Sequence, residues 1–416
     1  MEQSQTISIP QQRITVIDAL RGFALLGVIL IHMSQHYSNF SPDAAGERLF
    51  HLPAVDTAIQ WLSRNVIMGK FINIFAFLFG MSFFIQMDRA ARKGIDFRKR
   101  FIWRMAILFI IGMLGNCFYS GDILSIYAVF GVFMVFLYRF KNWVLIALAA
   151  LLLLGTPRML MAGYNSLTQT EQVENAPARQ APPAANRQRI RAPQEKPSFM
   201  RSAQNNLTRG MQSKLNYQFG FIGRGYVTLA LFLLGLVVGR IRFFEELQSK
   251  RKRNLYIFGG FVLATALINL IIDLFPPQPF RFSIPKGDEL TFSMLAVSSL
   301  NDIYMVLYSG ALAIGFILLY QVESIGKHLD VLSPYGRMGL TNYEIQSVLG
   351  SLFFSMWGLG AIFGSWGPTE VFLLGLLVYA AQIIFSKYWL KHCLYGPLEW
   401  VWRSATYLKI QPFRRI

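Results

Sequence analysis

The sequence predicts an all-α, polytopic integral membrane protein with about ten transmembrane helices and a C-terminal interfacial helix. Of its 416 residues, 54% are hydrophobic and only 15% are charged, and the mean hydropathy is +0.39, which is too apolar for a soluble chain of this size. Apolar runs of about 20 residues recur, each long enough to cross a bilayer. Short clusters of Arg and Lys separate these runs, as they do at the ends of membrane helices.

The apolar runs give ten predicted spans in two groups of five. They cover roughly residues 18–36, 66–87, 101–118, 122–139, 142–160, 222–240, 254–275, 296–320, 337–356 and 368–386. We therefore divide the chain into an N-terminal five-helix half (1–160), a flexible basic outer loop (161–221), a C-terminal five-helix half (222–390) and a cytoplasmic amphipathic tail (391–416).

The distribution of basic residues predicts the orientation. If the N-terminus is cytoplasmic, most of the 40 Lys and Arg residues lie in the inner segments, and few lie in the short outer loops. Cytoplasmic loops are enriched in Lys and Arg. We therefore expect an even number of spans with both termini in the cytoplasm. Cys117 and Cys393 then lie on opposite sides of the membrane and cannot form a disulfide.

Two polar segments flank the C-terminal half. The long loop contains "NAPARQAPPAANRQRIRAPQEKP", and its low content of large apolar residues predicts a poorly packed segment over 176–197. The loop is either a tolerated insertion or a basic surface for an anionic lipid headgroup or polymer. The tail, "YGPLEWVWRSATYLKIQPFRRI", mixes aromatic and cationic residues, a composition typical of a helix in the inner headgroup layer.

The net charge of +18 does not indicate a nucleic-acid partner, because the basic residues lie at the ends of apolar spans. The two cysteines have no CxxC partner and no His at metal-ligand spacing, so we expect no metal site.

The first span, "LRGFALLGVILIHMSQH", carries ionisable residues along one face. Arg21 and His32 are eleven residues apart, close to three helical turns, and therefore project from nearly the same face about 16 Å apart. Asp18 can pair with Arg21, and His36 follows His32 one turn later. A histidine within apolar sequence needs a polar partner, so we expect His32 to face the bundle interior.

Polar residues in other spans supply candidate partners for His32. Asp302, Asn301 and Asn73 should lie at a similar depth in the outer half of the membrane. Near the cytoplasmic side, polar residues accumulate at the start of the ninth span and predict a polar cavity. They are Arg337, Thr341, Asn342, Glu344 and Gln346.

The stretch "LRGFALLGVILIH" resembles the first span of membrane-bound acyltransferase-3 proteins, in which an Arg, ten residues and a His recur. The rest of the chain is more similar to the DUF418 (YeiB-like) family, which is assigned to a transmembrane acyltransferase superfamily. This similarity rests on "IDALRGFALLG", "KFINIFAFLFGMSFF", "YGRMGLTNYEIQS" and "GPLEWVWRSATY", which together bracket nearly the whole chain.

The resemblance implies an acyltransferase of the bacterial inner membrane. It would move an acyl group from cytoplasmic acyl-CoA, with acetyl-CoA as the expected donor, to a hydroxyl or amine of an envelope glycan or lipid. The base is either His32 or His51, with Asp302 and Asn301 as catalytic partners. The resemblance also suggests membrane lipid as a partner and leaves a homodimer possible.

The cytoplasmic cations would hold the CoA pyrophosphate, because guanidinium groups bind phosphate well. The candidates for this role are Arg21, Arg337, Asn342 and Arg104. Two other classes stay open: a transporter or lipid flippase that uses the same polar stripe, and a non-catalytic membrane scaffold.

Overall fold

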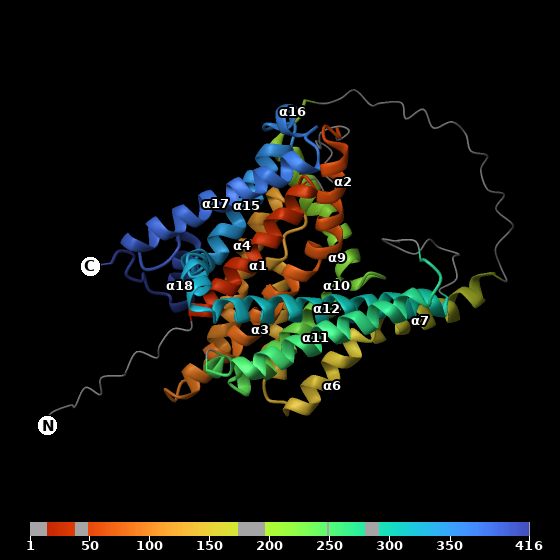
Figure 1. Cartoon of the computed structure of the whole chain (residues 1–416), viewed down its shortest axis with the longest axis horizontal. Helices are drawn as coiled ribbons and strands as arrows, with labels where there is room; N and C mark the ends of the chain where they lie inside the picture. The colour runs from red at the N-terminus through yellow and green to blue at the C-terminus, as the bar shows by residue number, and fades with distance from the viewer. Residues whose placement is uncertain (1–14, 38–48, 174–195, 248, 279–290, 416) are drawn as a thin grey trace.

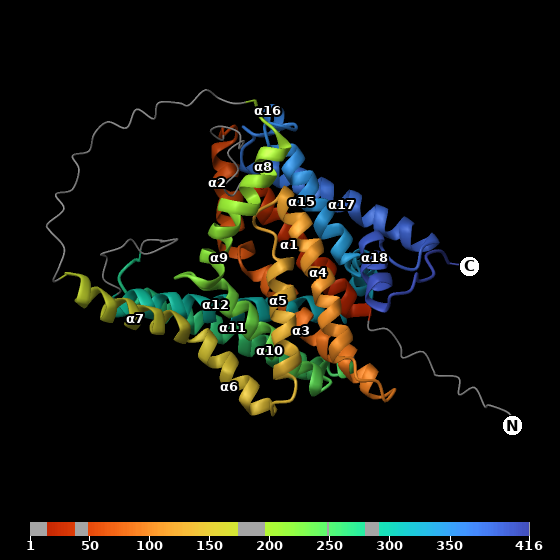
Figure 2. The same cartoon turned by 180° about the vertical axis from the view of Figure 1, so that it is seen from behind.

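The computed structural model describes residues 15–37, 49–173, 196–247, 249–278 and 291–415, and in this part of the chain helices are joined by loops and turns, with an isolated β-bridge between Cys393 and Arg414 (Figure 1 and, from behind, Figure 2). The first half contains α1 (Thr15–Ser34), α2 (Pro53–Leu62), a π-helical turn (Ser63–Ile67), α3 (Lys70–Ala91), α4 (Arg98–Phe118), α5 (Leu124–Leu137), α6 (Asn142–Leu153) and α7 (Thr156–Val173). The middle contains α8 (Phe199–Asn205), a π-helical turn (Asn206–Gly210), α9 (Met211–Phe219), α10 (Arg224–Arg240) and a 3-10 turn (Phe243–Glu246). The last part contains α11 (Arg251–Asp273), α12 (Phe292–Tyr320), α13 (Glu323–Leu329), α14 (Leu332–Arg337), α15 (Gly339–Phe354), α16 (Gly360–Phe363), α17 (Pro368–His392) and α18 (Pro397–Tyr407).

Within the described residues, six helical segments are long and apolar enough to cross a membrane, and eight are if each of two bent pairs counts as one span. A helix lies at each of the ten predicted positions, but α5 and α15 have only 14 and 16 residues. Helices of that length extend about 21 and 24 Å, less than the roughly 30 Å hydrocarbon core. The structure therefore supports a polytopic membrane protein with six to eight candidate spans, and the ten predicted positions include two helices that are shorter than a full span.

The exposed surface of α11 supports placement in a membrane. Only 6% of its most apolar stretch is buried, and Leu255, Leu263 and Leu270 are among its exposed side chains. Apolar area of this extent is unfavourable in water and is expected where lipid covers the protein.

Helix α1 lies at the centre of the bundle, with 72% of its span buried, and it crosses α14 closely. At Gly336, an added Cβ would lie 1.8 Å from the Asp18 carbonyl oxygen, and at Gly22 one would lie 2.6 Å from that of Leu332. Only glycine allows two helix backbones to approach this closely. This crossing brings Arg337, which follows Gly336, close to Arg21 of α1.

Helices α3 and α10 pack in the same way through one glycine on each. A Cβ at Gly80 would meet the Phe232 carbonyl oxygen at 2.1 Å, and one at Gly235 would meet that of Phe77 at 2.1 Å. Small residues on both helices therefore fix this contact, as is common between membrane helices.

The predicted outer loop 161–221 differs from the expectation over much of its length. Residues 156–173 form α7, and residues 199–219 form α8, a π-helical turn and α9. Lys214 of α9 is buried and donates a hydrogen bond to the Asn116 side chain of α4, so this segment packs against the bundle. Most of the segment 176–197, which we predicted to be poorly packed, lies outside the described residues.

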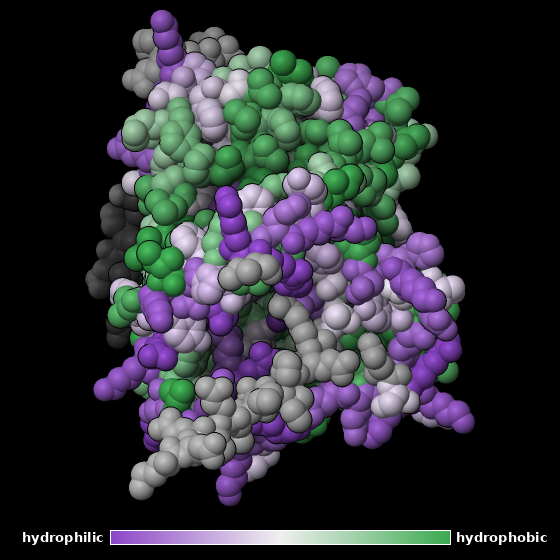
Figure 3. Space-filling model, turned by 90° about the vertical axis from the view of Figure 1, so that its left-hand side faces the viewer, coloured by the Kyte–Doolittle hydropathy of each residue, from purple (hydrophilic) through white to green (hydrophobic). Residues whose placement is uncertain are grey.

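The start of α1 and the C-terminal helix α18 lie on the same side of the bundle (Figure 1). Figure 3 shows that hydrophilic side chains gather in the lower half of this face. Cys117 and Cys393 are both free.

We predict that this face is cytoplasmic, because hydrophilic side chains gather on it and cytoplasmic segments of membrane proteins are enriched in Lys and Arg. In a variant without native cysteines (Cys117→Ser, Cys393→Ser), Lys409→Cys should react only with a permeant thiol reagent in intact cells. Lys409 is exposed in the structure. Thr57→Cys, at an exposed position of α2, should react with an impermeant reagent, and the reverse pattern would invert the orientation.

Candidate functional site

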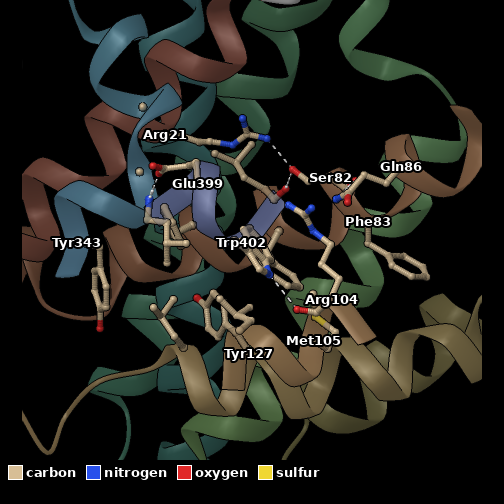
Figure 4. A pocket seen from close by; sticks show the side chains of 18 of the residues that line it. Arg21, Ser82, Phe83, Gln86, Arg104, Met105, Tyr127, Tyr343, Glu399 and Trp402 are labelled. Carbon is tan, nitrogen blue, oxygen red and sulfur yellow. Dashed lines mark hydrogen bonds between the residues drawn. The ribbon is translucent and has the colours of Figure 1, made fainter. Parts of the chain in front are cut away.

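A cavity of about 260 Å³ opens between α1, α3, α4, α5, α14, α15 and α18 (Figure 4). Three guanidinium groups line it: Arg21 from α1, Arg104 from α4 and Arg337 from α14. We predicted these three arginines, together with Asn342, as CoA ligands, and the fold brings the arginines, but not Asn342, to one cavity from three distant parts of the chain.

Contacts on both sides orient Arg21. Its Nη1 donates to the Asp18 carboxylate at 2.7 Å, and its Nη2 donates to the Ser82 hydroxyl at 2.6 Å. The Asp18 carboxylate is buried, whereas the Arg21 side chain keeps 25% of its exposed area. Arg21 is therefore held in place and still reachable from the cavity.

Arg104 packs against the C-terminal helix. Its guanidinium carbon lies 3.6 Å from the centre of the Trp402 ring, and the Trp402 indole donates to the Arg104 carbonyl oxygen at 2.8 Å. Trp103 donates to the Ala405 carbonyl oxygen at 2.9 Å. The tail helix predicted for the headgroup layer therefore packs on α4 and forms one wall of the cavity.

Glu399 of α18 caps the N-terminus of α15. Its carboxylate accepts hydrogen bonds from the Leu340 and Thr341 backbone amides, at 2.8 and 3.0 Å, and from the Thr341 hydroxyl at 2.5 Å. Burial raises the pKa of Glu399, while the Thr341 and Leu340 hydrogen bonds oppose that shift. A carboxylate at this position also interacts favourably with the helix dipole.

We predict that Glu399→Ala loosens α18 and lowers the free energy of unfolding by about 1–2 kcal/mol, as other lost helix caps do. Thermal unfolding in detergent measures the effect. Glu323→Ala is the matched control, because Glu323 is 85% exposed and forms an ion pair with Lys327, and exposed pairs contribute little. Equal losses in both variants would contradict a capping role.

The other end of the cavity is apolar and aromatic. Besides several Phe and Leu side chains, Tyr127 and Tyr343 line it. The Tyr343 hydroxyl accepts a hydrogen bond from the Ile123 amide at 3.2 Å, which fixes this ring at the cavity's inner end.

His32 lies behind Tyr343, as a member of an aromatic cluster. Its ring centre is 6.5 Å from that of Tyr343, 4.9 Å from that of Tyr119 and 5.3 Å from that of Tyr37. His32 therefore faces the bundle interior as predicted, but it does not line the cavity.

The partners predicted for His32 lie elsewhere. Asp302 forms an ion pair with Arg158 at 2.8 Å. Asn73 accepts from Arg224 at 2.7 Å and donates to Ser309 at 3.2 Å. Asn301, beside Asp302 on α12, is half-buried. The prediction paired these residues by estimated depth alone, whereas the helix faces direct them toward α7 and α10.

Two other predicted site residues also lie away from the cavity. His51 is exposed, and its Nδ1 lies 2.6 Å from the Glu370 carboxylate. The Asn342 amide is buried and donates to the Tyr335 carbonyl oxygen and the Ser386 hydroxyl. Asn342 therefore links α14, α15 and α17, while the cavity takes Arg337 from the same polar cluster.

Sequence reasoning missed an ionisable group beside the aromatic cluster. Lys214 of α9 interacts electrostatically with Asp122 and Glu344, and all three are buried. Asp122 begins the fourth predicted span, Glu344 was predicted only as part of the polar cavity at the ninth span, and Lys214 lies in the segment predicted to be a flexible loop. The amphipathic sequence of residues 199–219 was the available signal for a packed helix. In the described residues, no three His, Cys, Asp or Glu side chains form a group that could bind a metal.

These observations define a polytopic helical membrane protein with an arginine-lined cavity on the same side as its C-terminal helix. The chain matches DUF418, described as a protein family of unknown function, over residues 238–409. It is 28% identical to YxaH of Bacillus subtilis over 98% of both chains, and 25% identical to YeiB of Escherichia coli over 95% of this chain and 96% of that protein. An uncharacterized 39.9 kDa protein of Bacillus acidopullulyticus is 28% identical over 95% of this chain and 94% of its own length.

Proposed function

We propose that the protein is a membrane acyltransferase that takes an acyl group from cytoplasmic acyl-CoA and transfers it to a hydroxyl or amine of an envelope glycan or lipid. The observation that carries the proposal is the meeting of Arg21, Arg104 and Arg337 around one cavity. Three guanidinium groups suit the phosphates of CoA, because each can form two parallel charged hydrogen bonds.

The shape and lining of the cavity fit part of such a donor. Its volume of about 260 Å³ is just below the range of about 300–1,000 Å³ found for small-molecule pockets. The cavity therefore has room for a phosphate-bearing end or for the pantetheine arm, while the rest of the donor stays outside. The apolar lining near Tyr127 and Tyr343 suits the arm, which would point the thioester toward His32.

His32 is the base in this proposal. A neutral imidazole accepts the proton of the acceptor hydroxyl or amine while the acceptor atom attacks the thioester carbonyl carbon. The carbon–sulfur bond then breaks, and the CoA thiolate takes up the proton from the imidazolium. Tyr343 lines the cavity, and its ring centre lies 6.5 Å from that of His32, so the hydrogen bond that holds its hydroxyl to the Ile123 amide would break if the ring turned aside for the thioester.

The test uses purified protein in liposomes made from bacterial lipid extract, with acetyl-CoA labelled in the acetyl group added outside and label followed into the lipid and glycan fractions. We expect label transfer that depends on the protein and releases one free thiol per acetyl group transferred. Export of a lipid or solute without an acylated product would favour a transporter. The absence of both label transfer and CoA binding would contradict the proposal.

A further inference from the structure

A second group of cations is buried between α3, α7, α10 and α12, outside the cavity. It consists of Lys70, Arg158 and Arg224, whose exposed fractions are 3%, 4% and 8%. Charged side chains are costly inside a membrane protein, and those that occur there are usually paired or functional.

Arg158 is fully engaged with protein groups. It forms the ion pair with Asp302, and its Nε and Nη2 donate to the Phe221 and Ile222 carbonyl oxygens at 2.6 and 2.8 Å. Its Nη1 faces the Ser299 hydroxyl at 3.4 Å. Arg158 and Asp302 therefore neutralise each other.

Within the residues that the structure describes, Lys70 and Arg224 form hydrogen bonds but no ion pair. Lys70 donates to the Asn65 carbonyl oxygen at 2.8 Å, and its ammonium group lies 5.8 and 5.5 Å from the ring centres of Tyr304 and Tyr308. Arg224 donates through Nη2 to Asn73.

The Nη1 atom of Arg224 lacks a good acceptor. Among the described residues, its hydrogen-bond partner is the Met305 sulfur, at 3.6 Å, and a thioether is a weak acceptor. Of the donors in this group, the Nη1 atom is therefore the best placed to form a hydrogen bond with a ligand oxygen.

Electrostatic interactions connect members of this group. Arg224 lies within electrostatic range of both Lys70 and Asp302. Within the described part of the chain, Asp302 is the one carboxylate that forms an ion pair with any of the three cations. The group therefore carries two positive charges in excess, and burying such charges without an anion is unfavourable.

We propose that Lys70 and Arg224, supported by Arg158, bind the phosphate group of an anionic ligand inside the membrane region. The open Nη1 of Arg224 and the excess charge select a phosphate over a neutral headgroup. Tyr127 lines the cavity, and Arg224 is within electrostatic range of its hydroxyl, so the site lies next to the cavity's inner end. The role of this ligand rests on the proposed acyl transfer: in that reaction, the phosphate belongs to the acceptor of the acyl group.

The test is lipid binding, which does not require acyl transfer. Protein in a neutral detergent is titrated with phosphatidylglycerol, phosphatidylcholine or inorganic phosphate, and the thermal midpoint and the retained lipid in native mass spectrometry are measured. We expect phosphatidylglycerol to raise the midpoint more than phosphatidylcholine. Arg224→Gln and Lys70→Gln should lose most of that increment, whereas Arg64→Gln, at an exposed neighbouring position, should keep it.

The remaining outcomes separate the sources of the phosphate. An equal increment with inorganic phosphate alone would assign the site to a soluble phosphate compound, and an increment with the lipid only would assign it to a headgroup. If Arg224→Gln fails to fold, Asp302→Asn tests the proposal instead. Removing the carboxylate should lower the phosphatidylglycerol concentration that gives half of the full increase in the thermal midpoint several-fold. Increments that are the same in the wild type, Arg224→Gln and Asp302→Asn would overturn the proposal.

Discussion

Replacing His32 with Ala or Asn should lower acyl transfer by about 10²–10⁴-fold, the usual contribution of a general base. Asn keeps a polar side chain but cannot accept and release a proton near neutral pH, so both variants should fail alike. Since the His32 ring packs among Tyr37, Tyr119 and Tyr343 and hydrogen-bonds to no described residue, its loss should leave most of the fold intact.

The measurement is transfer of label from acetyl-CoA in liposomes, with CoA binding and thermal stability recorded for the same preparations. His51→Ala is the matched control, because His51 lies at the exposed pair with Glu370 and should lose little activity. The opposite ranking would move the base to the segment before α2. Loss of CoA binding together with loss of transfer would show that His32 acts through the fold.

Removing one guanidinium from the cavity should weaken CoA binding by about 10–100-fold. A hydrogen bond to a charged group contributes about 1.5–3 kcal/mol, and each 1.4 kcal/mol is about tenfold in affinity. Arg21→Gln and Arg337→Gln test the α1 and α14 sides, and Arg104→Gln tests the side covered by Trp402. Because the ligand is an anion, added salt should weaken wild-type binding more than binding to any of these variants.

Binding of CoA and of dephospho-CoA can be measured by calorimetry in detergent. Arg251→Gln removes the same charge from an exposed position at the start of α11 and should bind CoA like the wild type. If all four variants bind equally well, the cavity is not the donor site. A loss confined to Arg21→Gln would instead point to the Asp18 and Ser82 contacts that it breaks.

Some contacts of the candidate site could be predicted from the sequence, and others could not. The arginines were grouped correctly because each begins a span next to a basic cluster, and membrane topology then places them on one side. The partners of His32 were predicted incorrectly because depth along a helix does not specify which face of the helix turns inward. Lys214 was missed because the polar composition of residues 161–221 predicted a loop, although this segment contains the packed helix α9.

The sequence by itself determined the membrane class, the helical segments, the common side of Arg21, Arg104 and Arg337, and the inward direction of His32. These properties follow from hydropathy, helical period and charge at span ends, which are local. Only the tertiary structure decided that α14 crosses α1 at Gly22 and Gly336, that Glu399 of α18 caps α15, and that Asp302 pairs with Arg158 instead of serving His32. Such contacts join residues that lie far apart in the sequence, by 58 positions for Thr341 and Glu399 and by 144 for Arg158 and Asp302. The rotation and close approach of packed helices, which no local pattern encodes, decide which side chains meet.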